Sequence, residues 1–127
     1  MQPVDRRRNP LVLLVEDDPG LREAVVRGLA KAGYQVASAG SGREAVEAAQ
    51  ELHPDAVVMD VMLPDVRGSA AAEAIRRQDG LHAVPVLFVT AQAPAAVGDS
   101  LFPAPVLYKP FTYRQLVASV RELVRAA

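Results

Sequence analysis

Short apolar runs recur five times along this 127-residue chain, and helical patterns lie between them. The runs are about four to six residues long and rich in β-branched side chains, which favours strands over buried helices. Most are apolar at consecutive positions, as in parallel strands covered on both faces. The predicted strands are Leu11–Val15, Tyr34–Ala37, Ala56–Met59, Val84–Val89 and Val106–Tyr108.

Helix signals separate these strands. Asp18-Pro19 is typical of an N-cap followed by proline in the first turn, and Gly33 predicts the end of that helix. Capping-box patterns predict helices that begin at Ser41 and Thr112, and a further helix is expected over 68–78. Repeated β–α alternation predicts an α/β fold, a doubly wound (βα)5 arrangement with a five-stranded parallel sheet and helices on both faces.

The span 91–103 departs from this regularity. It contains Pro94, Gly98 and Pro103, so at most two or three helical turns are expected there.

Reactive side chains stand at the ends of four of the five predicted strands. Glu16 and Asp17 follow the first strand, Asp60 the third, Thr90 the fourth and Lys109 the fifth. Ligands of open α/β sheets bind beyond the carboxyl ends of the strands, so these five side chains are expected to meet at one edge.

Three carboxylates at one place need a compensating charge. Two carboxylates about 4 Å apart repel by about 4 kcal/mol at an effective dielectric near 20. Carboxylate oxygens without histidine or cysteine nearby suit Mg²⁺, which retains open positions for phosphoryl oxygens. Thr90 can donate a hydrogen bond and Lys109 supplies positive charge, as phosphoryl transfer requires. A carboxylate can itself act as the nucleophile and form an aspartyl phosphate.

Four motifs then carry a resemblance to a known family: Leu13-Leu14-Val15-Glu16-Asp17-Asp18, Met59-Asp60-Val61-Met62-Leu63-Pro64, Val89-Thr90-Ala91 and Lys109-Pro110-Phe111. In this order they resemble the receiver domain of response regulators in two-component systems. The resemblance implies a flavodoxin-like fold with strand order 2-1-3-4-5. Residues 10–127 would form the receiver domain, and residues 1–9 a flexible N-terminal arm.

The resemblance also implies a role for each site residue. Asp60 would accept the phosphoryl group from the phosphohistidine of a histidine kinase or phosphotransfer protein. Glu16 and Asp17, together with Asp60 and the backbone carbonyl of Met62, would hold Mg²⁺. Thr90 would bind a phosphoryl oxygen and Lys109 would pair with the acidic group. The protein would then be a signalling switch that acts on a downstream protein, and no enzyme beyond its own phosphorylation and slow dephosphorylation.

Two further features of the family map onto single positions. Asp18 precedes a proline and is better suited to cap the helix than to bind metal, which leaves the pair before it at the strand end. The Lys109-Pro110 peptide is expected to be cis, and Gly68 matches the glycine that closes the loop after the acceptor.

Some positions depart from the family pattern. Val106 stands where members usually carry an aromatic residue that moves with the threonine, and Tyr108 need not replace it. The segment between Thr90 and Lys109 is short, which predicts a remodelled fourth helix and partner face. The positions that govern hydrolysis of the acyl phosphate hold Met62, which cannot orient water, and Gln92, so slow self-dephosphorylation is expected.

Two alternatives remain open at this stage. The first is a pseudo-receiver, which uses the same fold as a phosphorylation-independent docking module. The second is a nucleotide-binding module, because Gly40-Ser41-Gly42-Arg43-Glu44-Ala45 fits a dinucleotide fingerprint. The second leaves most of the predicted site unused.

Composition limits the location and the partners. The 14 basic and 15 acidic residues give a net charge of −1, which predicts no direct nucleic-acid binding. The chain has no cysteine and no long apolar stretch, so a cytoplasmic protein without membrane contact is expected. Weak homodimerisation remains open, and His53 and His82 lack the spacing of metal ligands.

Overall fold

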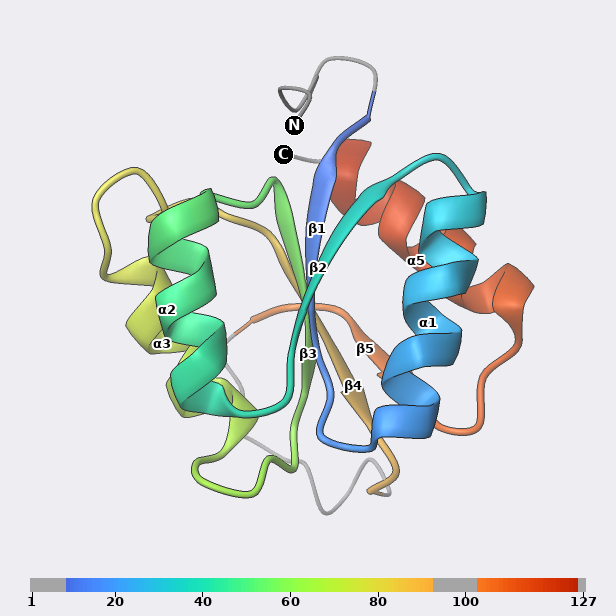
Figure 1. Cartoon of the computed structure of the whole chain (residues 1–127), viewed down its shortest axis with the longest axis horizontal. Helices are drawn as coiled ribbons and strands as arrows, with labels where there is room; N and C mark the ends of the chain where they lie inside the picture. Colours follow the sequence, from blue (N-terminus) through green and yellow to red (C-terminus); the bar gives the residue numbers. More distant parts are fainter. Residues whose placement is uncertain (1–8, 93–102, 126–127) are drawn as a thin grey trace.

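A computed structural model describes residues 9–92 and 103–125, and within them a five-stranded parallel sheet lies between two layers of helices (Figure 1). Helices α2 and α3 cover one face, and α1 and α5 cover the other. The strands are β1 (Leu11–Val15), β2 (Gln35–Ala39), β3 (Ala56–Asp60), β4 (Val86–Thr90) and β5 (Val106–Tyr108). The helices are α1 (Pro19–Lys31), α2 (Gly42–Leu52), α3 (Gly68–Arg76) and α5 (Tyr113–Arg125).

The order of the strands is β2-β1-β3-β4-β5, so the predicted flavodoxin-like architecture is confirmed. The register aligns the carboxyl ends of neighbouring strands. Val15 pairs with Ala39 and Met59, and Thr90 pairs with Tyr108. The residues at or just after these ends therefore share one edge of the sheet, the lower edge in Figure 1.

Each strand contributes side chains to two separate cores, because successive residues point to opposite faces. Leu13, Val57 and Phe88 belong to the core under α2 and α3. Leu14, Val58 and Leu87 belong to the core under α1 and α5. All five residues of β1, β3 and β4 are buried, which explains why these strands are apolar or nearly so throughout.

The predicted helix starts are borne out where caps were expected. The carboxylate of Asp18 accepts hydrogen bonds from the N–H groups of Gly20 and Leu21. Ser41 Oγ accepts from Glu44 N at 3.2 Å, and Thr112 Oγ1 accepts from Gln115 N at 3.1 Å. These side chains satisfy N–H groups that have no partner inside their helices.

Element boundaries differ from the predictions by a few residues. β4 begins at Val86 instead of Val84, because Pro85 has no N–H and the N–H of Val84 bonds to Leu81 in a turn. β2 covers Gln35–Ala39 instead of Tyr34–Ala37, and α3 ends at Arg76. Most of the span 91–103 and of the predicted N-terminal arm, residues 1–9, lies outside the described residues. The short fourth helix and the domain bounds therefore stay predictions.

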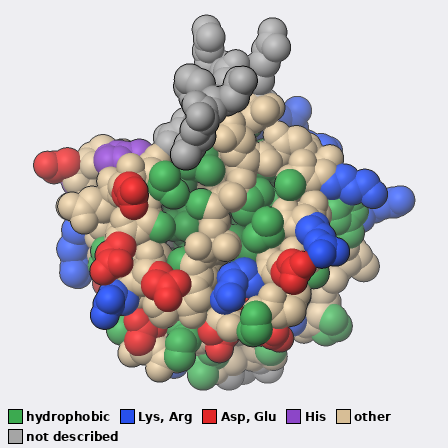
Figure 2. All heavy atoms as spheres, in the orientation of Figure 1, with side chains coloured by type: hydrophobic (Ala, Val, Ile, Leu, Met, Phe, Trp, Pro, Cys, Tyr) green, Lys and Arg blue, Asp and Glu red, His purple; other side chains and the backbone are tan. Residues whose placement is uncertain are grey.

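The surface over the β2 edge carries both signs of charge. Figure 2 shows acidic and basic side chains interspersed on this face, with apolar atoms between them. Some of these charges form exposed pairs on one helix, such as Arg27 Nη2 and Glu23 Oε1 at 2.6 Å. Such pairs contribute little to stability because both partners remain in water. No helix among the described residues has the length and apolar character needed to cross a membrane.

A single carboxylate joins the loop after β3 to the start of α2. Asp65 Oδ1 accepts from Gly42 N at 2.9 Å, and Asp65 Oδ2 accepts from Arg43 N at 2.9 Å. Hydrogen bonds from Gly42 and Arg43 lower the pKa of Asp65 below its ordinary value of 3.8. The loop that follows Asp60 is therefore tied to a helix more than twenty residues earlier in the chain.

We predict that Asp65→Asn lowers the free energy of unfolding at pH 7, because an amide offers one acceptor oxygen where the carboxylate offers two. The pKa of Asp65 is depressed in the folded state, so its contribution is present above the unfolded value of 3.8 and is lost as pH falls through the folded value. The difference in urea midpoint between variant and wild type should shrink from about pH 7 to about pH 3. Asp79→Asn, the same change in another exposed loop, is the control. A difference that is constant over this range contradicts the assignment.

Candidate functional site

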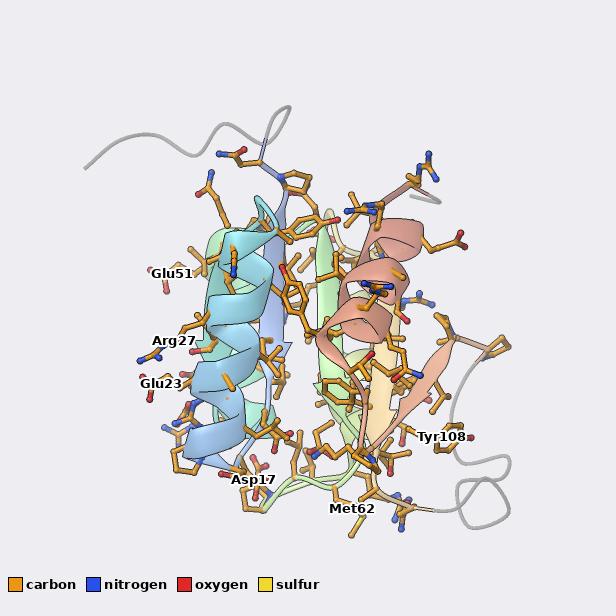
Figure 3. All side chains as sticks on the ribbon, turned by 90° about the vertical axis from the view of Figure 1, so that its right-hand side faces the viewer. Asp17, Glu23, Arg27, Glu51, Met62 and Tyr108 are labelled. Carbon is orange, nitrogen blue, oxygen red and sulfur yellow. The ribbon has the colours of Figure 1, made fainter. Side chains whose placement is uncertain are left out.

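The site residues predicted from the sequence lie together at the carboxyl edge of the sheet. Glu16 and Asp17 follow β1, Asp60 ends β3, Thr90 ends β4 and Lys109 follows β5. Figure 3 shows Asp17 and Met62 at this same end of the molecule. The fold therefore brings together side chains that are up to 93 residues apart in sequence.

The ammonium group of Lys109 links two buried carboxylates. Its Nζ lies 2.8 Å from Glu16 Oε1 and 2.9 Å from Asp60 Oδ2. Glu16 is 3% exposed and Asp60 is 4% exposed, so neither charge is solvated well by water. A charge-assisted hydrogen bond to each carboxylate is what makes their burial next to one another tolerable.

Backbone N–H groups hold the other oxygen of each carboxylate. Asp60 Oδ1 accepts from Met62 N at 2.9 Å, and Glu16 Oε2 accepts from Asp18 N at 3.1 Å. Both side chains are thus fixed at both oxygens, whereas Asp17 is exposed. The Asp17 carboxylate is the part of the acidic group that faces solvent.

The three carboxylates are close enough to share a cation. Glu16, Asp17 and Asp60 each offer one oxygen, and these oxygens lie within 4.8 Å of one another. All donors are hard oxygens, the ligand type that Mg²⁺ prefers. One ammonium group shared by two of three carboxylates leaves negative charge uncompensated, so the residues present fit a divalent cation.

Burial has a clear effect on the proton affinity of Glu16. It raises the pKa of Glu16 to about 7, since the charged form is poorly solvated, while the hydrogen bond from Lys109 acts in the opposite direction. For Lys109, burial of the ammonium group acts to lower the pKa. The hydrogen bonds to Asp60 and Glu16 outweigh it, and the net effect raises the pKa of Lys109. The lysine therefore stays charged at neutral pH.

Thr90 is completely buried at the end of β4, next to β5. Its Oγ1 accepts from Gln92 N at 3.0 Å, and its carbonyl oxygen accepts from Lys109 N at 2.8 Å. The Lys109-Pro110 peptide is cis, as predicted. The Oε1 atom of Gln92 is buried and has no hydrogen-bond partner among the described residues.

Gly68 lies where only a glycine fits. A Cβ atom at this position would overlap the backbone carbonyl of Asp60. The chain returns to the acceptor strand at this point, and Gly68 N donates to Val61 O at 2.8 Å. The absence of a side chain thus lets α3 start directly against the end of β3.

The start of α2 offers no free site for a pyrophosphate. In a dinucleotide fold the N–H groups here would bind phosphate, but those of Gly42 and Arg43 donate to Asp65. The geometry therefore speaks against the nucleotide-binding alternative. His53 lies outside the acidic group, with its Nε2 atom 3.3 Å from the carbonyl oxygen of Asp79.

Two residues that no sequence pattern singled out also support this edge. One is Asp65, which ties down the loop after β3. The other is Arg22 of α1, whose Nη1 atom donates to the carbonyl oxygen of Glu16 at 2.9 Å. The other site residues were predicted because each stands at the end of a strand. Neither Asp65 nor Arg22 directly follows a strand, so the same reasoning could not predict them.

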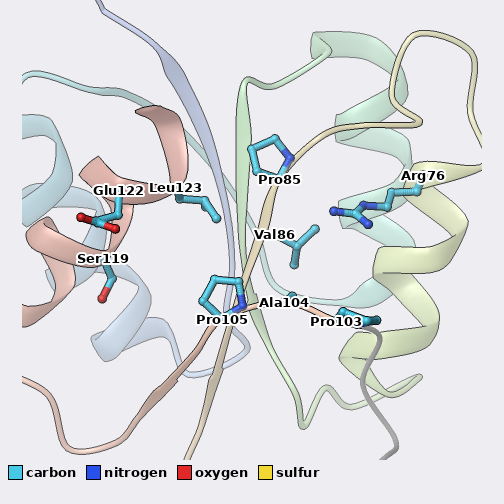
Figure 4. A pocket seen from close by; sticks show the side chains of 9 residues that line it. All are labelled: Arg76, Pro85, Val86, Pro103, Ala104, Pro105, Ser119, Glu122 and Leu123. Atoms are coloured by element: carbon cyan, nitrogen blue, oxygen red, sulfur yellow. The ribbon is translucent and has the colours of Figure 1, made fainter. Parts of the chain in front are cut away.

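A cavity of about 430 Å³ lies at the opposite end of β4 and β5 from the acidic group (Figure 4). The side chains of α3 and α5 face each other across it, with the prolines before β4 and β5 between them. Its lining residues are Arg76, Pro85, Val86, Pro103, Ala104, Pro105, Ser119, Glu122 and Leu123. It shares no residue with the acidic group.

Comparison with known proteins identifies the family of the chain. The family model described as the response regulator receiver domain matches residues 12–121. This chain belongs to that family. Receiver domains are signalling modules of two-component systems, and they bind Mg²⁺ at an acidic pocket.

Curated relatives extend beyond the receiver domain. The chain is 36% identical over 120 residues to the transcriptional regulatory protein PrrA of Mycobacterium tuberculosis, which covers 92% of the chain and 51% of PrrA. It is 34% identical over 117 residues to the DNA-binding response regulator MtrA of Mycolicibacterium smegmatis, covering 90% of the chain and 50% of MtrA. The chain thus spans about half the length of the curated relatives it matches.

These relatives correct the expected partners. Net charge predicted that nucleic acid is no partner, but MtrA is named as a DNA-binding protein. The prediction was wrong because the charge of a receiver domain carries no information about the half of such regulators that this chain does not match.

A solved structure gives the most direct comparison for the metal. The receiver domain of the sensor histidine kinase PA1611 from Pseudomonas aeruginosa superposes with a TM-score of 0.85 at 29% identity, covering 92% of this chain and 98% of that one. That structure has a magnesium ion coordinated in its active-site cleft. The two chains share the receiver fold, and the described part of this chain has its acidic group at the carboxyl ends of the strands.

We predict that Lys109→Met destabilises the domain by about 3–5 kcal/mol at pH 8, because it leaves two buried carboxylates without their shared counter-charge. The loss should be smaller at pH 5, where the carboxylates can take up protons once the ammonium is gone. Urea unfolding at both pH values measures it. Lys31→Met, at the only other lysine, is the matched control and should change little. Equal losses for the two variants would refute the role of the bridge.

Proposed function

We propose that this receiver domain accepts a phosphoryl group on the carboxylate of Asp60 from the phosphohistidine of a histidine kinase or phosphotransfer protein. The reaction depends on Mg²⁺, and the modified domain changes its contacts with a downstream protein. The observation that carries the proposal is the sharing of one lysine ammonium by two buried carboxylates at the strand ends, beside a third that faces solvent.

The chemistry is an exchange of one bond to phosphorus for another. A carboxylate oxygen of Asp60 attacks the phosphorus atom, the P–N bond to the donor imidazole breaks, and an acyl phosphate forms. Lys109 lies against Asp60 and offsets negative charge as the phosphoryl group approaches. We assign to the hydroxyl of Thr90 a hydrogen bond to a phosphoryl oxygen. Burial keeps competing water away from the reacting carboxylate.

Glu16, Asp17 and Asp60 would hold the Mg²⁺ ion, together with the backbone carbonyl of Met62. Bound there, the ion neutralises charge on the phosphoryl oxygens during transfer. The buried carboxylate of Glu16 is held at one oxygen by Lys109 and at the other by Asp18 N, so its orientation is set before any ion arrives. Exposed Asp17 gives the ion an approach from solvent.

A pseudo-receiver, which docks onto partners without phosphorylation, is the second candidate. The observation that favours it is at β5, where Val106 is half-buried and Tyr108 is 38% exposed. Figure 3 shows Tyr108 at the margin of the molecule, on the far side from α1. Position 106 holds a valine where many family members carry an aromatic residue that moves inward with the threonine, and exposed Tyr108 does not replace it. This changes how a signal would leave the site and leaves the acceptor chemistry intact.

We predict that acetyl phosphate with Mg²⁺ adds one phosphoryl group to the wild-type chain, seen as a single mass increment in intact mass spectrometry. Acetate replaces imidazole as the leaving group, so no kinase is needed. Asp60→Asn should show no increment, and omission of Mg²⁺ should abolish it. An unmodified wild-type chain would instead support the docking module.

The same sample tests how long the modification lasts. After removal of acetyl phosphate the increment should decay slowly, because the thioether of Met62, which is 51% exposed, cannot orient an attacking water. Rapid decay without a phosphatase contradicts this reading.

Mg²⁺ affinity should also depend on pH near neutrality. A carboxylate must lose its proton before it binds the ion, and the pKa of Glu16 is about 7. We expect the Kd to fall as pH rises from about 6 to 8 and then to level off, with at most about a tenfold change per pH unit. Calorimetric titration measures it, and Glu16→Gln should bind more weakly with a flatter profile. A wild-type Kd that is constant from pH 6 to 8 would exclude this role.

A further inference from the structure

Arg22 crosses from α1 to the end of β1 and lies at the rim of the acidic group. Its Nη1 atom donates to the carbonyl oxygen of Glu16 at 2.9 Å, and the side chain is half-buried. That carbonyl belongs to the peptide between Glu16 and Asp17. The guanidinium group thus holds the peptide that joins two of the three clustered carboxylates.

Gly40, in the turn after β2, lies against the guanidinium group of Arg22. A Cβ on Gly40 would lie 2.8 Å from Arg22 Nη1 and 3.7 Å from Arg22 Cζ. The backbone of Gly40 is outside the left-handed region, so its conformation does not itself call for glycine. A side chain at Gly40 would therefore displace the guanidinium group of Arg22 from its present position.

Other hydrogen bonds fix the surroundings of the same peptide. Glu16 N donates to Ala39 O at 3.0 Å, and Gly40 N donates to Glu44 Oε2 at 3.0 Å. The first bond ties the end of β1 to β2, and the second ties the turn after β2 to α2. The Glu16 carbonyl is the remaining polar group of this residue, and Arg22 is the partner that holds it.

We propose that Arg22 is a positioning residue for the divalent cation, and that the missing side chain of Gly40 leaves space for its guanidinium group. The proposal rests on the proposed Mg²⁺ site. By fixing the Glu16-Asp17 peptide, Arg22 fixes the directions in which both carboxylates leave the backbone. A change of such a supporting residue typically lowers metal affinity by about 10- to 100-fold.

The test is a double-mutant cycle on the full chain, with Mg²⁺ affinity measured by calorimetric titration. Arg22→Ala removes the contact, and Gly40→Ala displaces the flexible end of the same arginine while its charge is retained. We expect each variant to weaken Mg²⁺ binding by about tenfold. The double variant should bind no more weakly than Arg22→Ala alone, since both changes remove one interaction.

Arg27→Ala is the matched control, because it removes the same charge from the same helix. Arg27 is highly exposed, pairs with Glu23, and points away from the site in Figure 3. The Arg27→Ala variant should bind Mg²⁺ as tightly as the wild type does. Circular dichroism and urea midpoints in EDTA show that each variant is folded, so a loss of affinity is separated from a loss of stability.

The possible failures are distinguishable. If the wild-type chain does not bind Mg²⁺, the proposed function itself fails. If the wild type binds and Gly40→Ala binds equally well, or if the two substitutions weaken binding additively, the positioning role of Arg22 is overturned and the proposed function stands.

Discussion

The ammonium group of Lys109 is the point on which the site depends. Its single positive charge stabilises two carboxylates, those of Glu16 and Asp60, that would otherwise be costly to bury. The group also joins three strands, because Glu16 follows β1, Asp60 ends β3 and Lys109 follows β5. The remaining negative charge is not a defect of the fold. It makes this edge suited to a divalent cation, as the proposed function requires.

The position of the site followed from strand ends alone. Every strand of a parallel sheet delivers its last residue to one edge, so Asp60, Thr90 and Lys109 could be nominated without knowing any distance. Their pairing could not be. Nothing in the sequence says that Lys109 contacts both Glu16 and Asp60, since this depends on the order of strands and on side-chain rotamers. The resemblance to a family implied the order of the strands. The contacts of Lys109 could be known only from the three-dimensional structure.

Supporting residues were harder to predict than reactive ones. Asp65 and Arg22 act through backbone groups of other segments, and a carboxylate in a loop or an arginine on a helix is most often merely solvated. Strand boundaries failed for a local reason at Pro85, where a missing N–H delays the start of β4. Net charge misled on partners because it describes only the residues present.

The single layer of strands divides the interior into two compartments, and among the residues that the structure describes no side chain belongs to both. Substitutions beneath α1 and α5 can be repacked without moving those beneath α2 and α3, so effects on opposite faces should be nearly additive. The helices on one side of the sheet can accordingly change in sequence while the helices on the other side and the acidic edge stay as they are. Diversification of recognition surfaces around an unchanged reaction centre is the evolutionary freedom that this architecture confers.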